Sequence, residues 1–166
     1  FYLLPKIHKD RLKPPGRPIV SSRGSCLENT SRYVDFFLRD FVQSLPSYIQ
    51  DTKHFLQIIV QVNWDPTYVL ITLDVGPLYT SIEHNQGIEA CCHFLRNRSI
   101  CYFDHIQMIL DMIDFCLKNN IFTFNGSLYR RRYGTAMGTC LAPSLANLFM
   151  GWWEEQVPVA DLTADD

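Results

Sequence analysis

The spacing of apolar and polar residues along the chain predicts several amphipathic helices. Apolar residues recur at helical spacing over residues 30–45, where Pro46 ends the pattern. A shorter helix is expected after Asp51, whose side chain can cap it. The same periodicity predicts further helices over residues 85–97, 104–119 and 143–155.

Two of these helices have an apolar side that can be assigned residue by residue. Asn29 or Thr30 is expected to cap helix 30–45, and Asp104 is expected to cap helix 104–119. The residues expected to face the core are Tyr33, Phe37, Phe41 and Val42 in the first helix, and Ile106, Ile109, Leu110, Ile113 and Leu117 in the second.

Three segments are expected to be extended. The run YVLITLDV, residues 68–75, is apolar and rich in β-branched residues, which is typical of a buried strand, and it ends on Asp74. The prolines of residues 5–18 exclude a helix and predict extended strands around a basic loop, with RPIVSS as a short strand. IFTFNGSLYRRRY predicts a hairpin, because Asn125-Gly126 can adopt the positive φ angles of a tight turn. Strands and helices without strict alternation indicate an α+β fold.

The composition is that of one globular domain. The chain has 166 residues, of which 47% are hydrophobic and 19% are charged, so it can bury a sizeable core. It contains no apolar run of about eighteen residues and no signal segment, so no membrane span is expected. The chain begins with Phe1, and its first motif follows almost at once, so we expect it to be a piece of a longer protein.

The six cysteines are expected to be free thiols, because nothing in the sequence indicates secretion. The cysteines and histidines between Cys91 and His105 match no spacing of zinc ligands, so no zinc site is expected there.

Positive charge is concentrated at the start of the chain. The net charge is −2, yet residues 1–39 contain eight of the fifteen Lys and Arg residues, whereas residues 133–166 contain none. A basic front end favours an anionic partner, with nucleic acid or nucleotide phosphates first. The alternative is a solvated surface without a partner.

Asp74 is the leading candidate for metal binding. A carboxylate at a strand end, with Gly76-Pro77 forming a turn beside it, is well placed to hold a divalent cation, because Mg²⁺ binds one or two carboxylates together with phosphate oxygens. The alternative is an aspartate that only caps the turn. Tyr79, shortly after it, could floor a sugar pocket or belong to the core.

Basic side chains form a second candidate site. Lys6, Lys9 and Arg17 lie on the expected extended hairpin and could clamp phosphates, since arginine suits bidentate phosphate contacts. The arginines at 130–132 could contact the backbone of a template, or they could form the exposed face of a hairpin strand. The sequence alone leaves both alternatives open.

The order of three segments resembles the reverse transcriptases of Penelope-like retroelements. The segments are LPKIHK…GRPIVSS, LDVGPLYTSI and GTAMGTCLAPSLANLFM, and with their connections they span residues 3 to about 153. The third segment is the most specific of them. The resemblance implies the fingers and part of the palm of a right-hand polymerase, an α+β fold with an incomplete antiparallel sheet packed on helices.

The resemblance also implies a division of the chain into parts. These are fingers with the basic hairpin and helices at 1–68, a palm strand with the first catalytic aspartate at 69–83, a helical and hairpin insertion of the fingers at 84–133, the glycine loop and helix of the palm at 134–155, and a disordered acidic tail at 156–166.

Roles for individual residues follow from the same resemblance. Asp74 would match the first catalytic carboxylate, which binds both metal ions, and the carbonyl of Val75 would match a further metal ligand. Lys6 and Arg17 would match residues that contact the incoming triphosphate. Tyr79 would match the aromatic residue that packs under the ribose and selects against a 2′-hydroxyl.

Other residues would contact bases or nucleic acid. Met137 and Gly138 would lie against the nascent base pair, and Asn147 would lie on the helix behind that loop. The remaining residues expected to contact nucleic acid are Lys9, Lys13 and Arg131.

The implied reaction is two-metal nucleotidyl transfer with Mg²⁺ or Mn²⁺. One ion would activate the primer 3′-hydroxyl, and the other would steady the triphosphate and the leaving pyrophosphate. The implied partners are an RNA template, a DNA primer and dNTPs, in an intracellular, nuclear location and without a membrane. The resemblance does not indicate an oligomeric state.

The sequence departs from the family pattern in several places. Cys140 stands where the family usually has proline, and Gly76-Pro77 replaces less constrained residues. These enzymes need a further Tyr/Phe-x-Asp-Asp hairpin, whereas the adjacent aspartates here, Asp165-Asp166, are expected to belong to a frayed tail. A thumb and an endonuclease domain are not expected in this chain either. We therefore expect the chain alone to be inactive, and its open sheet edge predicts low solubility.

Three interpretations follow. The chain is a fragment of an RNA-directed DNA polymerase, or a non-catalytic retroelement remnant that is at most a nucleic-acid-binding module. A third candidate, a helical domain that binds a protein partner, predicts no affinity for nucleic acid.

Overall fold

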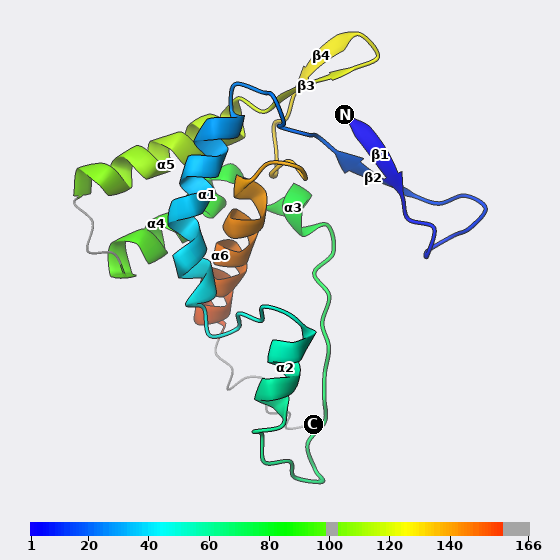
Figure 1. Cartoon of the computed structure of the whole chain (residues 1–166), viewed down its shortest axis with the longest axis vertical. Coiled ribbons are helices and arrows are strands. Elements are labelled where there is room, and N and C mark those ends of the chain that lie inside the picture. The colour runs from blue at the N-terminus through cyan, green and yellow to red at the C-terminus, as the bar shows by residue number, and fades with distance from the viewer. Residues whose placement is uncertain (99–102, 158–166) are drawn as a thin grey trace.

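The computed structural model describes residues 1–98 and 103–157. Within these ranges the chain is a mixed α+β structure with six helices and two small antiparallel sheets (Figure 1). The helices are α1 (Glu28–Gln43), α2 (Thr52–Ile59), α3 (Leu78–Ser81), α4 (His84–Arg98), α5 (Phe103–Lys118) and α6 (Leu141–Gln156). The strands are β1 (Tyr2–Pro5), β2 (Gly16–Ile19), β3 (Ile121–Phe124) and β4 (Ser127–Arg130). The α+β prediction is confirmed at this level.

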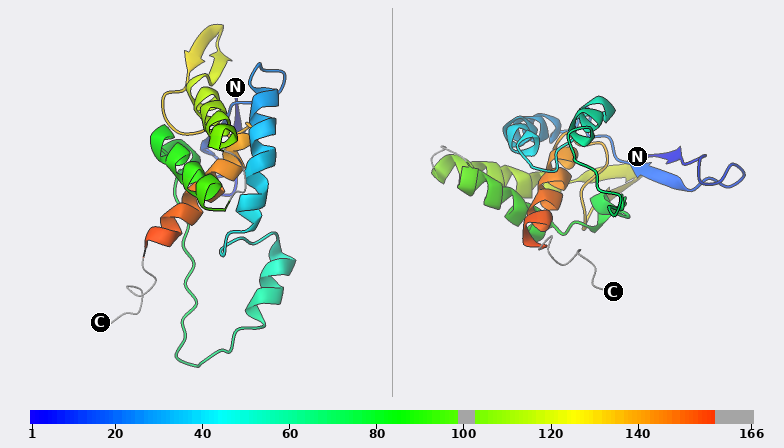
Figure 2. Two further views of the ribbon diagram at one scale, coloured as in Figure 1. Left: turned by 90° about the vertical axis from the view of Figure 1, so that its left-hand side faces the viewer. Right: turned by 90° about the horizontal axis from the view of Figure 1, so that it is seen from below.

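Four long helices form the body of the molecule. α6 packs against both α1 and α4, and α5 packs against the same two helices (Figure 2). Burying one large aliphatic or aromatic side chain stabilises a fold by about 1.5–3 kcal/mol, so this shared core is the main stabilising feature. Its most deeply buried large side chains are Leu38, Phe94, Ile109, Ile113, Leu141, Leu145 and Leu148.

The inward side of α5 matches its sequence pattern. All five residues expected to face the core of helix 104–119 are buried. The helix begins one residue earlier than expected, at Phe103, so Asp104 lies in the first turn instead of capping it. A carboxylate there still interacts favourably with the positive end of the helix dipole.

The inward side of α1 differs from the expected one. The buried residues include Val34, Leu38 and Val42, whereas Tyr33 is 42% exposed. Phe37 and Phe41 pack only partly against the core. Val34, Leu38 and Val42 repeat every four residues and form one stripe along the helix, whereas Tyr33, Phe37 and Phe41 each come one residue earlier and lie beside that stripe.

The expected cap of α1 is also wrong. The helix begins at Glu28 with Leu27 as the residue before it, so Asn29 and Thr30 lie inside the first turn. Glu28 instead accepts a hydrogen bond from the backbone N–H of Gly24, at 2.6 Å. The cap of α2 is as expected, since Asp51 Oδ1 accepts from the N–H of His54 at 2.8 Å.

Both expected hairpins form. β1 pairs antiparallel with β2, and β3 pairs antiparallel with β4. The turn between β3 and β4 contains Asn125 with φ 49° and Gly126 with φ 75°, the positive angles that the Asn-Gly pair predicts. The described residues therefore contain two separate two-stranded sheets, and the expected single sheet packed on the helices is not formed by them.

The buried strand expected at residues 68–75 does not form. This segment is extended but belongs to neither sheet, and Val69 is 80% and Leu73 88% exposed. A strand needs a neighbouring strand to accept its backbone hydrogen bonds and cover its apolar faces. In the described part of the chain each strand already pairs within its own hairpin, so the apolar run lies without a partner strand.

Residues 49–77 form an excursion away from the four-helix body. It carries α2 and returns to the body at α3 through the extended segment (Figures 1 and 2). α2 has no buried residue, and Phe55, Leu56 and Ile58 on it are exposed. This excursion therefore leaves much of its apolar surface in water.

Two expectations fall outside the described residues. Cys101 is one of them, and the acidic tail from residue 158 onward, including Asp165-Asp166, is the other. The five described cysteines are not in disulfides. No helix in the described ranges is both long enough and apolar enough to cross a membrane.

Candidate functional site

The segment between β4 and α6, residues 134–140, is the point at which distant parts of the chain meet. We call it the glycine loop. Gly134 has φ 68° and Gly138 has φ 126°, angles that side-chain-bearing residues rarely adopt. Gly134, Thr135 and Ala136 are buried, whereas Gly138 is exposed. The loop thus has one side against the protein and one side open.

The end of the basic hairpin pairs with the glycine loop. The N–H of Val20 donates to the carbonyl of Met137 at 3.0 Å. Ser22 donates twice to the carbonyl of Gly138, from its N–H at 3.3 Å and its hydroxyl at 3.0 Å. A Cβ at Gly138 would lie 2.6 Å from the carbonyl oxygen of Val20, so this approach needs glycine.

The turn that carries Tyr79 contacts the other end of the loop. The N–H of Thr135 donates to the carbonyl of Tyr79 at 2.6 Å. A Cβ at Gly134 would lie 2.5 Å from that same carbonyl oxygen. His84, at the start of α4, has its Nε2 3.0 Å from the carbonyl oxygen of Gly134. Backbone contacts therefore fix Tyr79 beside the glycine loop.

α6 starts directly behind the loop and is held to α1 by polar contacts. Ser144 is buried, and its hydroxyl donates to Asp35 Oδ1 at 2.5 Å. Asp35 Oδ2 in turn accepts from Arg39 at 2.9 Å. Asn147, on the same helix, is exposed.

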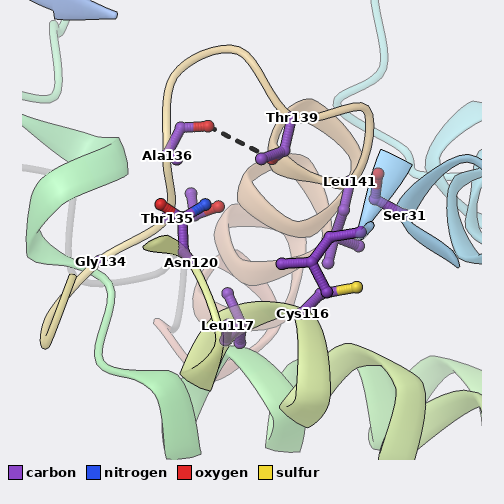
Figure 3. Close-up of a pocket in the computed structure, with 10 residues that line it drawn as sticks. Ser31, Cys116, Leu117, Asn120, Gly134, Thr135, Ala136, Thr139 and Leu141 are labelled. Atoms are coloured by element: carbon purple, nitrogen blue, oxygen red, sulfur yellow. Dashed lines mark hydrogen bonds between the residues drawn. The ribbon is translucent and has the colours of Figure 1, made fainter. Parts of the chain in front are cut away.

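The inner side of the glycine loop encloses a small cavity (Figure 3). Its volume is about 10 Å³, far below that of a nucleotide. Asn120 lines it and is 7% exposed, and its Oδ1 has no hydrogen-bond partner among the described residues. A nucleotide could approach only the outer side of the loop, where Met137 is half-buried and Gly138 is open to solvent.

The basic residues of the first hairpin lie along its length. Lys6 is half-buried directly after β1, and Arg17 is exposed on β2 opposite Leu4. Lys9 and Lys13 are exposed on the loop between the two strands. Asp10 organises that loop by accepting hydrogen bonds from the amides of Lys13 and Leu12, which lower its pKa.

Asp74 and Val75 lie in the extended segment that leads to α3, and both are exposed. Within residues 1–98 and 103–157, the Asp74 side chain forms no hydrogen bond or ion pair. No group of three or more His, Cys, Asp or Glu side chains in those ranges could hold a metal ion. The structure thus places the backbone of Tyr79 against one end of the glycine loop, with its half-buried side chain packed against the core, while Met137 and Gly138 at the other end contact Val20 and Ser22. Asp74 lies on a solvent-facing stretch before α3.

Arg131 is partly withdrawn from solvent. Its backbone N–H donates to the carbonyl of Asn120 at 2.9 Å. The buried Nε of its side chain has no hydrogen-bond partner among the described residues. Burial lowers the pKa of this guanidinium. The neighbouring Arg130 and Arg132 are exposed.

The described core cysteines carry no sign of reactivity. Burial raises the pKa of Cys91 to about 12 and that of Cys116 to about 11, so both stay protonated at neutral pH.

Sequence reasoning missed two residues that build the site. Ser22 and His84 each bond a carbonyl of the glycine loop. Ser22 is the last residue of the expected strand RPIVSS, and its place inside a segment of the resemblance was the available signal. For His84, 50 residues from Gly134, the sequence holds no signal.

No protein-family model, curated protein or solved structure matches the chain at a significant level.

Proposed function

We propose that the chain is part of an RNA-directed DNA polymerase, the fingers and a portion of the palm of a reverse transcriptase of the Penelope-like kind. One observation carries the proposal. Val20 and Ser22 at the end of the basic hairpin, and the carbonyl of Tyr79, all bond the glycine loop. The three sequence segments that carry the resemblance thus meet at one loop, although more than one hundred residues separate the first from the third.

The geometry supports a different role in nucleotide binding for each residue near this loop. Arg17 lies on β2, three residues before Val20, which pairs with the glycine loop. From there it would contact the triphosphate of a bound nucleotide. Tyr79 is held to the loop through its carbonyl, and its half-buried ring packs partly against the core, so only the open part of the ring would lie under the ribose. Met137 and Gly138 would present backbone to the new base pair, because glycine lets a substrate approach closely. The contribution of these residues is position, not proton transfer.

The described residues do not by themselves fit the two metal ions of such a polymerase. At the position that the resemblance assigns to the metal ions, they offer one carboxylate, Asp74, and the carbonyl of Val75, whereas each Mg²⁺ needs several oxygen ligands. The alternative function, a nucleic-acid-binding module without catalysis, is favoured by this ligand set.

Binding to a primer–template hybrid tests the proposal. We expect an RNA–DNA hybrid with a recessed 3′ end to bind the chain, with an affinity that falls steeply as salt rises. Lys6→Ala and Arg17→Ala should each weaken binding several-fold and lower the salt dependence by about one charge. Lys53→Ala is the matched control, because Lys53 is an exposed lysine on α2. Absence of binding, or equal loss in all three variants, would contradict the proposal.

Nucleotide binding separates the two functions. Photo-crosslinking of a labelled dNTP to the chain on a hybrid should require the complementary template base and should be lost in Tyr79→Ala. Binding of the hybrid without any such crosslink favours the non-catalytic module. Primer extension by this chain alone is expected to give no product. Incorporation that disappears in Asp74→Ala would contradict that expectation.

A further inference from the structure

The β3–β4 hairpin gathers aromatic side chains on one face. Phe122 pairs with Tyr129 across the two strands, and Phe124 lies on the same face two residues along. The rings of Phe122 and Tyr129 stack with centroids 5.7 Å apart, and those of Phe124 and Tyr129 are 6.4 Å apart. Phe1 stacks on Phe122 at 5.6 Å and meets Phe124 edge-on at 5.2 Å.

These contacts also join the two hairpins. Phe1 directly precedes β1, so its ring attaches the basic β1–β2 hairpin to β3–β4, and Figure 1 shows the start of β1 beside the β3–β4 hairpin. The rings are far from covered. Phe124 is 53%, Tyr129 47% and Phe1 40% exposed. We call Phe1, Phe122, Phe124 and Tyr129 the aromatic face.

The two hairpins and the stretches that flank them in the sequence are poor in acidic residues. Residues 115–153 contain no Asp or Glu, and residues 1–27 contain one, Asp10, whose Oδ1 accepts hydrogen bonds within its own loop. Arg130, on β4, and Arg132, just after it, are exposed. Arg130 pairs with Ile121, so its side chain leaves the narrow hairpin on the side opposite the rings. Neither arginine forms an ion pair within the described residues. The basic side chains that do so there are Arg32, Arg39, His93 and Lys118.

We propose that the aromatic face binds single-stranded nucleic acid, with bases stacked on Tyr129 and Phe124, and that Arg130 and Arg132 of the same hairpin supply positive charge to the phosphates as the strand passes its edge. Half-open rings on a hairpin that also carries exposed arginines match the two needs of an unpaired strand, a stacking surface and a counter-charge. A duplex hides its base faces, so it can use the cations but not the rings. The inference rests on the proposed function in taking nucleic acid as the partner, and it adds a site for unpaired nucleotides away from the glycine loop.

An oligonucleotide without bases tests the stacking directly. Fluorescence anisotropy would compare oligo(dT) and oligo(U) of about 12 nucleotides, within the range that one small domain covers, with an abasic DNA strand of equal length. The wild-type chain should bind the strands with bases about tenfold more tightly than the abasic strand, the effect expected from stacking of one or two bases. The arm that binds more tightly, DNA or RNA, identifies the strand that the site takes.

Variants assign that preference to the hairpin. Phe124→Leu with Tyr129→Leu keeps apolar bulk but removes the rings, and should bring binding of oligo(dT) and oligo(U) down to the abasic level. Tyr129→Phe keeps the ring and should bind like the wild type. Phe36→Leu is the matched control, because Phe36 is an aromatic residue that is 68% exposed on α1. Arg130→Gln with Arg132→Gln should weaken binding of all strands and lower its salt dependence.

The outcomes separate this inference from the proposed function. If the wild-type chain binds the abasic strand as tightly as the others, the inference is wrong even if the leucine variant fails to fold. Equal loss of binding in Phe36→Leu also contradicts it. If the leucine variant binds like the wild type while Lys6→Ala and Arg17→Ala lose the primer–template hybrid, the inference fails and the proposed function stands. If neither the hybrid nor the single strands bind, both fail.

Discussion

Gly134 and Gly138 face different segments but meet the same constraint. Each lies so close to a carbonyl of a distant segment that a Cβ would overlap it, and each has a positive φ angle. Glycine is thus required twice in five residues, once for the Tyr79 turn and once for the end of the basic hairpin. This double requirement explains at the level of single residues why the sequence of the loop is so distinctive.

Substitution of Gly138 tests this constraint. Gly138→Ala should lower the free energy of unfolding by about 1–3 kcal/mol, because the new methyl group meets the Val20 carbonyl and φ becomes unfavourable. Gly76→Ala is the control, since no atom lies within 4 Å of a Cβ there. Urea denaturation of both variants gives the comparison, and equal stabilities would mean that the loop does not hold this contact in solution.

At the scale of the elements, α6 and the helix α1 packed against it connect the core to the glycine loop. α6 begins directly after the loop and packs on α1 and α4, and Ser144 and Asp35 add a hydrogen bond between α6 and α1. The position of the loop therefore depends on the packing of α1, which lies opposite the start of α6.

Truncation of a core residue in α1 measures that dependence. Leu38 is fully buried, so Leu38→Ala should cost about 2–5 kcal/mol through lost burial and the cavity that remains. Phe36→Ala, on the exposed side of the same helix, should change stability by less than about 1 kcal/mol. Thermal denaturation followed by circular dichroism would report both, and a small effect of Leu38→Ala would contradict the four-helix core.

At the scale of the whole molecule, the excursion of residues 49–77 leaves much apolar surface without packing partners. It exposes the apolar residues of α2 and the run 68–75, and no described strand pairs with that run. Extended, β-branched and nearly uncharged segments of this kind associate with one another along their open edges. Such surface is the physical basis for the low solubility expected from the sequence.

Charge placed on this run should keep the chain monomeric. Leu70 is 65% and Leu73 88% exposed, so Leu70→Lys with Leu73→Lys costs little burial and opposes strand association. Sedimentation velocity should show concentration-dependent assemblies for the wild type and fewer for this variant. Leu12→Lys, at a residue that is 94% exposed in the basic hairpin, should leave association unchanged. A wild-type chain that is monomeric at high concentration would contradict the prediction.

Much of the local structure could be predicted from the sequence, because it depends on nearby residues. Helical periodicity located α1, α4, α5 and α6 to within a few residues, Asp51 marked the cap of α2, and Asn125-Gly126 marked the hairpin turn. The buried side of α1 was predicted only in part. The sequence offers apolar residues both at 33, 37 and 41 and one position later in each turn, and only packing against the neighbouring helices selects the stripe that is buried.

The site shows the same limit. Tyr79, Met137 and Gly138 could be named from the sequence, but the hydrogen bonds of Ser22 and His84 to the loop join segments far apart in the chain. The run 68–75 has every local property of a buried strand and still remains exposed. Sequence alone determined the helices, the turns and the glycines of the loop, since each follows from local conformational preference. Only the tertiary structure decided which segments meet at the loop and which apolar run lacks a partner, because strand pairing and burial depend on neighbours that local preference cannot specify.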